Sequence, residues 1–366
     1  MFENCFKLKV LMLLILILLI SCNKKSEINK NYTIQLQVGN NNYEIPLSTI
    51  PIKQKKTTRI WKKVKTELAF TLGGLKDTLL YSPTIVKTDN KGNIYILDPP
   101  AFSVKKFNKK GIYLESFGKK GRGPGEFISP FRFDVTLDGK VAVLDVSQNK
   151  CTFFINGRYF SINIKYNPFE ICFLSTSEFA ILQVINALDH SPIMKYDYLK
   201  KDITEYANIL LTKKLKDLNL GALPFLQGEI LNNNGDLIYI PKYLNFFSIY
   251  SKDGKTIKAY KTIDQTDLPY VKKKSFRVTR FKLPGKFISS LSASVVKNFL
   301  IIISNKGMKI NKVCVADFYS NNTGEYKFSI KIPFIKKFGK IYFSEDRIFF
   351  NQPDGSIVVL NYEIES

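Results

Sequence analysis

The chain has 366 residues, is 45% hydrophobic and carries a formal net charge of +24 at neutral pH. This length fits two ordinary domains or one large all-β domain, and the apolar content suffices for a sizeable core. The single histidine, His190 in "ALDHSP", is typical of an exposed turn. Catalytic triads that need histidine and multi-histidine zinc sites are therefore not expected.

The positive charge has two interpretations. It could serve an anionic partner, or it could follow from AT-rich codon usage, since Lys, Asn, Ile, Phe and Tyr are all abundant; we favour the second. Lysines are dense only in Lys53–Lys65 and Val271–Lys282, where they alternate with apolar residues as in strands. Neither run resembles a nucleic-acid module, so no nucleic-acid partner is predicted.

The amino terminus has the pattern of an export signal. Lys7 and Lys9 precede an uninterrupted apolar run, Val10–Ile20. Eleven residues at about 1.5 Å each reach only half of a bilayer core, so the run is too short to span it. We predict a signal peptide over 1–21 and a polar tether with an N-terminal extension over 22–56.

The end of this run, Leu19-Ile20-Ser21-Cys22, resembles the bacterial lipobox. The resemblance implies cleavage before Cys22 and attachment of a diacylglycerol to its thiol, usually with N-acylation, for example by palmitate. The alternative is an uncleaved anchor with a buried cysteine. Because Asn23 follows and "NKKSE" has no clear acidic tag, we predict a lipoprotein of the cell envelope, in the outer membrane facing the periplasm.

An internal repeat begins near residue 88. Thr88–Asp98 aligns with Val135–Asp145 at a period of 47, matching Gly92 to Gly139. Each unit reads as four strands separated by turns. Weaker copies follow at Pro168–Leu210, Gly228–Ile263 and Ser289–Ile330, and Gly339–Glu363 supplies three more strands.

These units predict an all-β fold, a six-bladed β-propeller over 57–366 with four-stranded antiparallel blades. The strand missing from the last blade is assigned to Thr66–Gly74 near the amino terminus, which would close the ring without an exposed edge. The rival architecture is a pair of β-sandwiches. The best helix candidate is Leu210–Gly221.

The glycine-rich stretch Phe117–Phe127 is predicted to connect blades rather than to bind phosphate. A phosphate-binding loop needs a lysine after its last glycine, whereas Pro124 follows Gly123 and the chain then enters a strand. Glycine allows the positive φ that such a crossover requires.

Asp89–Pro130 resembles an NHL repeat, with its "DNKGNIYILD", "VKKFNKKG" and "FGKKGRGPGEFISP". The whole chain, lipobox included, resembles six-bladed NHL-like propeller lipoproteins of the Bacteroidetes. The match weakens after the first unit, where Val141-Ala142-Val143 departs from the pattern and Pro241 replaces the Asp. The family includes an amidating lyase, whose zinc histidines this chain lacks, and calcium-dependent lactonases. The lactonase resemblance implies channel carboxylates around a divalent cation such as calcium, with candidates Glu126, Asp134, Glu170 and Glu229.

Two repeated aspartates, Asp98 and Asp145, are interpreted as structural, accepting backbone N–H groups in the turn that follows. Three cysteines lie in the body of the chain, Cys151, Cys172 and Cys314; Cys5 would leave with the signal peptide. Buried free thiols are the simplest interpretation, and a Cys151–Cys172 bridge stays open in an oxidising compartment.

No catalytic set is recognisable, and no cofactor is predicted. The leading hypothesis is therefore a lipid-anchored binding or scaffold module for an envelope protein or an anionic glycan. The candidate residues of the ligand face are Arg122, Phe131, Arg132, Tyr243 and Phe246. The alternative is a metal-dependent, lactonase-like hydrolase that uses the channel carboxylates.

Overall fold

The computed structural model divides the chain into two compact units, 1–33 and 34–366. It describes residues 33–38, 41–75, 78–164, 168–183, 191–207, 226–264, 266, 270–275, 278–282, 288–311, 313–332 and 339–365. The predicted signal peptide, Cys22, His190 and the helix candidate Leu210–Gly221 lie outside these residues. The fold described below is that of the second unit.

Six sheets form the blades. The first three contain β5 (Ile85–Thr88), β6 (Ile94–Asp98), β7 (Ser103–Phe107) and β8 (Tyr113–Phe117); β11 (Pro130–Val135), β12 (Val141–Asp145), β13 (Lys150–Ile155) and β14 (Arg158–Asn163); and β15 (Pro168–Phe173), β16 (Glu178–Gln183), β17 (Ile193–Asp197) and β18 (Asp202–Ala207). All strand pairs within these sheets are antiparallel.

The other three blades follow in chain order. They contain β19 (Gly228–Asn233), β20 (Asp236–Pro241), β21 (Phe246–Tyr250) and β22 (Thr256–Lys261); β25 (Ala293–Val296), β26 (Phe299–Ile303), β27 (Cys314–Ser320) and β28 (Tyr326–Ile332); and β29 (Ile341–Phe343), β30 (Arg347–Asn351), β31 (Ser356–Ile364) and β4 (Val64–Gly73). The predicted six-bladed propeller is confirmed, and the pair of sandwiches is wrong.

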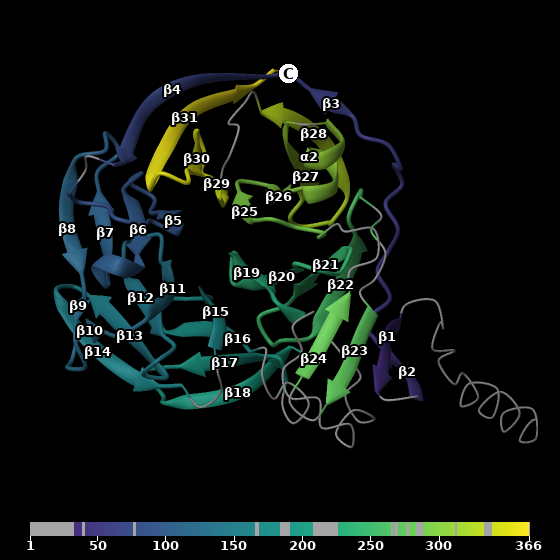
Figure 1. Cartoon of the computed structure of the whole chain (residues 1–366), viewed down its shortest axis with the longest axis horizontal. Helices are drawn as coiled ribbons and strands as arrows, with labels where there is room; N and C mark the ends of the chain where they lie inside the picture. Colours follow the sequence, from purple (N-terminus) through teal and green to yellow (C-terminus); the bar gives the residue numbers. More distant parts are fainter. Residues whose placement is uncertain are drawn as a thin grey trace, which may run out of the picture. The chain divides into compact units, whose positions relative to one another are not determined.

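The first strands of the six sheets lie around the centre, where each contacts the first strand of the next blade from β5 through to β29 (Figure 1). The ring closes because β4 pairs antiparallel with β31, from Ser356↔Gly73 to Ile364↔Val64. This confirms that a strand near the amino terminus completes the last blade.

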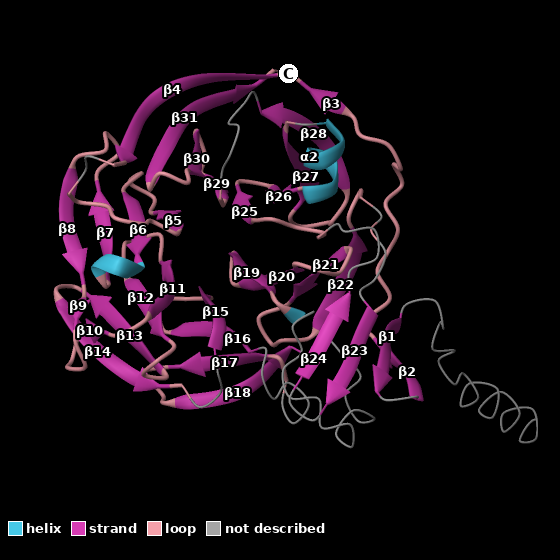
Figure 2. Ribbon diagram, viewed as in Figure 1, coloured by secondary structure: helices cyan, strands magenta, loops and turns pink. Residues whose placement is uncertain are grey.

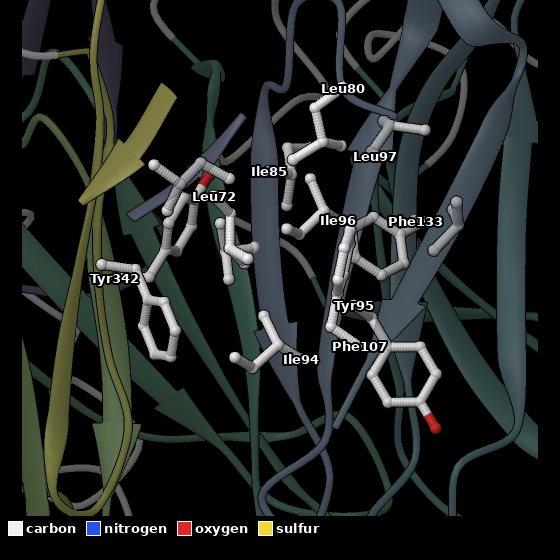
Figure 3. Packing of buried hydrophobic residues seen from close by; sticks show 14 of the residues in the cluster. Leu72, Leu80, Ile85, Ile94, Tyr95, Ile96, Leu97, Phe107, Phe133 and Tyr342 are labelled. Carbon is white, nitrogen blue, oxygen red and sulfur yellow. The ribbon is translucent and has the colours of Figure 1, made fainter. Parts of the chain in front are cut away.

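Apolar side chains pack between the last and first blades, where the ring closes. Leu72 and Tyr342 of the last blade share one core cluster with Ile94 and Tyr95 of the first (Figure 3). Phe349 of the last blade belongs to the same cluster. The middle strands are buried on both faces because a blade packs on each side; β6 and β12 are buried along their whole length. The fourth strands lie at the rim, and β8 is mostly exposed.

The ring consists mainly of β-strands, and a few short elements lie between them (Figure 2). A turn of 3-10 helix, η1 (Pro99–Ala101), follows β6; two short paired strands, β9 (Lys119–Lys120) and β10 (Glu126–Phe127), lie in the first crossover; and α2 (Asn305–Asn311) joins β26 to β27. Within the described ranges, no helix combines the length and the apolar character needed to cross a membrane.

A further sheet lies outside the blades. Its order is β2 (Asn41–Pro46), β1 (Thr33–Val38), β23 (Tyr270–Ser275) and β24 (Val278–Lys282), and β1 runs parallel to β23. The basic run Val271–Lys282 forms most of this hairpin. A short strand, β3 (Trp61–Lys62), adds to blade 5 in parallel with β28.

The repeated aspartates hold the crossovers. Asp98 accepts the N–H groups of Tyr81 and Ser82, at 2.8 and 2.9 Å, from the segment that leads into β5. Asp145 does the same for Ile128 and Ser129, at 2.6 and 3.2 Å. The structural interpretation is confirmed, but the predicted bonds to the following turn occur only at Asp145, where Ser147 and Gln148 donate.

The first crossover also needs its glycine. Gly118 has φ +94°, as predicted for this connection, and a Cβ there would lie 2.2 Å from the Phe127 ring. The three cysteines of the described body, Cys151, Cys172 and Cys314, are buried and free, so the simpler interpretation is confirmed and no Cys151–Cys172 bridge forms.

Candidate functional site: the central channel

The first strands present charged side chains to the centre of the ring. Lys87 of β5 lies 3.3 Å from Asp134 of β11, which also accepts the Phe173 N–H at 2.8 Å. Arg132 of β11 donates from Nε to Glu170 of β15 at 2.9 Å. Burial lowers the pKa of Lys87, but the negative charges around it, Asp134 first and then Glu170 and Glu229, together outweigh burial and the pKa is raised. These contacts join blades 1, 2 and 3 around the channel.

A second group joins blades 4, 5 and 6. Glu229 of β19 accepts the Ala293 N–H at 2.7 Å and pairs with Lys340 Nζ at 3.2 Å. Lys242, in the turn after β20, has its pKa lowered by burial and by the charges of Lys340 and Arg132, against the pull of Glu229. Each of the three acids is thus paired with a basic side chain, and each joins two neighbouring blades.

The ring has two distinct ends. We call the end where β5, β11, β15, β19, β25 and β29 begin the crossover face, and the end where they finish the hairpin face. A cavity of about 1020 Å³ lies toward the hairpin face and receives residues from all six blades. Its polar lining includes Thr88, Asp138, Thr176, Asn234, Ser294 and Lys297. Buried Tyr342 and Phe349 add apolar surface deeper in the channel.

The residues predicted for the ligand face lie toward the crossover face instead. Arg132 places its guanidinium 3.9 Å from the Phe131 ring centroid and 5.2 Å from that of Phe169, and the two rings pack edge to face at 5.9 Å. Tyr243 lies under Lys242 Nζ, 5.6 Å from its ring centroid. The structure therefore brings Phe131 and Arg132 together, with Phe169 as a third member that sequence reasoning missed.

The other two candidates are separate. Arg122 is exposed within the first crossover. Phe246 is only 3% exposed. Its expected exposure is wrong because it starts β21, whose five residues are all buried between neighbouring blades. A role of any of these residues in ligand binding stays a prediction.

The four acids considered for a metal site lie in two different regions of the structure. Asp134, Glu170 and Glu229 reach the channel, each engaged by a lysine or arginine, as described above. Glu126 lies apart in the first crossover, where it accepts the Gly123 N–H at 2.8 Å, and this bond with the charge of Lys119 lowers its pKa. Among the described residues, no group of three or more His, Cys, Asp or Glu side chains could hold a metal ion.

Sequence reasoning missed the hairpin-face cavity. The Asn-rich run Asn232–Asn234, at the end of β19 and in the turn that follows, lines this cavity. Lys87 and Lys340 were missed as well. A usable signal was the recurrence of one charged residue at the start of successive inner strands, at Arg132, Glu170 and Glu229.

A closed ring of six four-stranded blades around a lined channel defines the chain as a six-bladed β-propeller protein. The family model DUF5128, described as "6-bladed beta-propeller", matches residues 71–329, and the chain belongs to this family. No curated protein matches the sequence. The NHL resemblance of Asp89–Pro130 stays a prediction.

Solved structures share the fold at low identity. A protein from Bacteroides fragilis described as exported aligns with a TM-score of 0.55 at 13% identity, over 87% of this chain and 100% of that one. A member of the DUF4221 family from Bacteroides vulgatus aligns with a TM-score of 0.55 at 10% identity, over 83% and 99%. A streptogramin B lyase aligns with a TM-score of 0.51 at 13% identity, over 82% and 98%. At such identities the likeness concerns the fold alone.

Proposed function

We propose that the protein is a lipid-anchored binding module of the cell envelope whose ligand site is the hairpin-face cavity. The observation that carries this proposal is the cavity of about 1020 Å³, lined by polar residues from all six blades. Its size matches ligand sites in general, and a rigid ring preorganises the groups that line it. The fold shared with a Bacteroides protein that is described as exported supports an envelope or secreted location.

The lining favours a glycan over an extended protein surface. Amide and hydroxyl groups of Asn90, Thr176 and Asn234 can both donate to and accept from sugar hydroxyls. Several charged members of the lining are already paired, since Lys87 binds Asp134 and Lys297 lies 2.6 Å from Glu345. An anionic glycan and an envelope protein stand as the other partners that the experiment must distinguish.

Binding can be tested with purified protein and an array of bacterial envelope glycans, with acidic polysaccharides as a separate arm. Asn234→Gly and Thr176→Ala should each weaken binding about fivefold, since one hydrogen bond contributes about 1 kcal/mol. Asn149→Gly is the matched control, because Asn149 and Asn234 are both exposed with positive φ, 47° and 55°, but Asn149 follows β12 on the crossover face. Equal losses in the control would refute the site, and crosslinking in cells would reveal a protein partner.

The anchor is proposed at Cys22, with the protein in the outer membrane facing the periplasm. The support is the lipobox resemblance at Leu19–Cys22 together with the apolar run before it. Mass spectrometry of the mature amino terminus should find an acylated Cys22, and Cys22→Ala should release the protein from the membrane fraction. An unmodified Cys22 in membrane-bound protein would contradict lipidation.

The contacts of the channel acids do not favour the hydrolase alternative. A lactonase-like site needs carboxylates free to coordinate a cation, whereas Asp134, Glu170 and Glu229 each contact a basic side chain. Asp134 and Glu229 also accept a backbone N–H group of a neighbouring blade. These contacts give the three acids a role in joining blades.

A further inference from the structure

A segment that ends with β3 runs along the outside of blades 4 and 5, and we call residues 50–63 the rim strap. Ile52 donates its N–H to Ala259 O at 2.8 Å and accepts the Lys261 N–H at 2.9 Å. The Gln54 side chain bonds Gly324 O at 3.0 Å and accepts the Tyr326 N–H at 2.8 Å. The rim strap is therefore held to the ring along its length, and its outward side chains are presented at fixed positions.

Large apolar side chains of the rim strap face solvent. Ile50, Ile52, Ile60 and Trp61 are 53%, 47%, 41% and 41% exposed. Single exposed apolar residues are ordinary on a protein surface, but here four occur between positions 50 and 61 of one segment that is hydrogen-bonded to the rim. Trp61 is the sole tryptophan of the chain.

Exposed lysines lie on the rim strap and on the strands next to it. Exposed lysines on and beside the rim strap are Lys53, Lys55, Lys56, Lys63, Lys65, Lys258, Lys327 and Lys331. Among the described residues, the acids that pair with them are Glu325, with Lys55 and Lys327, and Glu365, with Lys65. Lys331 Nζ lies over the Trp61 ring, 4.6 Å from its centroid. The rim strap and the strands next to it thus present exposed apolar side chains and a strong positive charge.

We infer that this rim patch, the four apolar side chains and eight lysines named above, docks on an anionic phospholipid surface. Tryptophan favours the boundary between headgroups and acyl chains, isoleucine gains from burial on the acyl side of this boundary, and lysines beside them gain from the negative surface potential. An acidic protein would complement the charge of the lysines but would leave the four apolar side chains without a partner. The inference rests on the proposed membrane anchoring, because an anchor at Cys22 places Ile50 only 28 positions further along the chain.

The sole tryptophan makes the docking directly measurable. The mature protein, acylated at Cys22, is reconstituted into vesicles of phosphatidylcholine brominated in its acyl chains, either alone or mixed with an equal part of phosphatidylglycerol. In the anionic vesicles we expect Trp61 emission to shift to the blue and to fall by about half, and high salt to reverse both changes. In phosphatidylcholine alone, little quenching is expected.

Charge reversal at lysines of the rim strap tests the docking, and charge reversal at distant lysines is the matched control. Lys53→Glu, Lys56→Glu and Lys63→Glu combined should return Trp61 emission in anionic vesicles to its level in phosphatidylcholine. Lys91→Glu, Lys109→Glu and Lys110→Glu combined, which alter three exposed lysines of blade 1, should leave quenching intact. Absence of quenching in anionic vesicles overturns the docking inference. Flotation of the same samples reports the anchor separately: protein that floats with neutral vesicles but shows no quenching in anionic ones keeps the anchor and loses the docking face.

Discussion

Arg59 of the rim strap lies 2.9 Å from Asp317 of β27, 258 positions later in the chain, with two of its nitrogens bonded to the two carboxylate oxygens. The same guanidinium reaches Asp264 at 2.6 Å. The Arg59 side chain is 12% exposed and that of Asp317 is 2% exposed, so the pair is withdrawn from water. The contact fastens the rim strap to blade 5 before the chain enters β4 and closes the ring.

Loss of this contact should be costly. Arg59→Leu leaves two buried carboxylates without their partner, and we expect the free energy of unfolding to fall by about 3–5 kcal/mol. Arg158→Leu, at an exposed arginine of β14, should change stability little. Denaturant unfolding of both variants measures the difference, and similar stabilities would show that the buried pair contributes nothing.

The first crossover offers a test of backbone conformation against packing. Gly118→Ala introduces both a strained positive φ and a Cβ within 2.2 Å of the Phe127 ring. Gly157→Ala introduces only the strain, since φ is +73° and nothing lies within 4 Å of its Cβ position. We expect the Gly157 variant to lose about 1 kcal/mol of stability and the Gly118 variant about 2–4 kcal/mol. Equal losses in thermal unfolding would mean that Phe127 moves aside.

Low pH should weaken the hydrogen bonds that Asp145 accepts from the first crossover. Burial raises the pKa of this carboxyl, but bonds from the Gln148 side chain and from the N–H groups of Ile128 and Ser129 outweigh it, and the pKa is lowered from its usual 3.8. A lowered folded pKa gives stability that is present above the unfolded pKa and lost as pH falls through the folded one. The stability gap between wild type and Asp145→Asn should therefore be widest at neutral pH and narrow below pH 3.8. A gap independent of pH would contradict this.

The buried cysteines should be inert in the native protein. Burial raises the pKa of Cys314 to about 12 and raises that of Cys151 well above its ordinary value, so little thiolate exists at neutral pH. A thiol reagent should label Cys151, Cys172 and Cys314 only after denaturation, and mass spectrometry under non-reducing conditions should find no bridge among them. Rapid native labelling would indicate local opening of the blades.

Local patterns were enough to identify the blades. The Gly and Asp spacing of Thr88–Asp98 and Val135–Asp145, and the three-stranded remainder at Gly339–Glu363, together located both the repeat and its closing strand at Thr66–Gly74. These signals can be recognised in the sequence because each strand and turn is formed by neighbouring residues. In addition, the last blade of a ring needs a strand to pair with the exposed backbone groups of its edge. Exposure was harder to judge, as Phe246 shows, since burial depends on the blade packed alongside.

The amino-acid sequence therefore settled the architecture, the number of blades and the structural part played by Asp98 and Asp145. Long-range geometry settled the rest: the pairing of Arg59 with Asp317, the charged contacts of Arg132 with Glu170 and of Lys340 with Glu229, and the position of the cavity at the hairpin face. The physical reason is that these contacts join residues from different blades. Their distances follow from how the blades close around the channel, which no local spacing encodes.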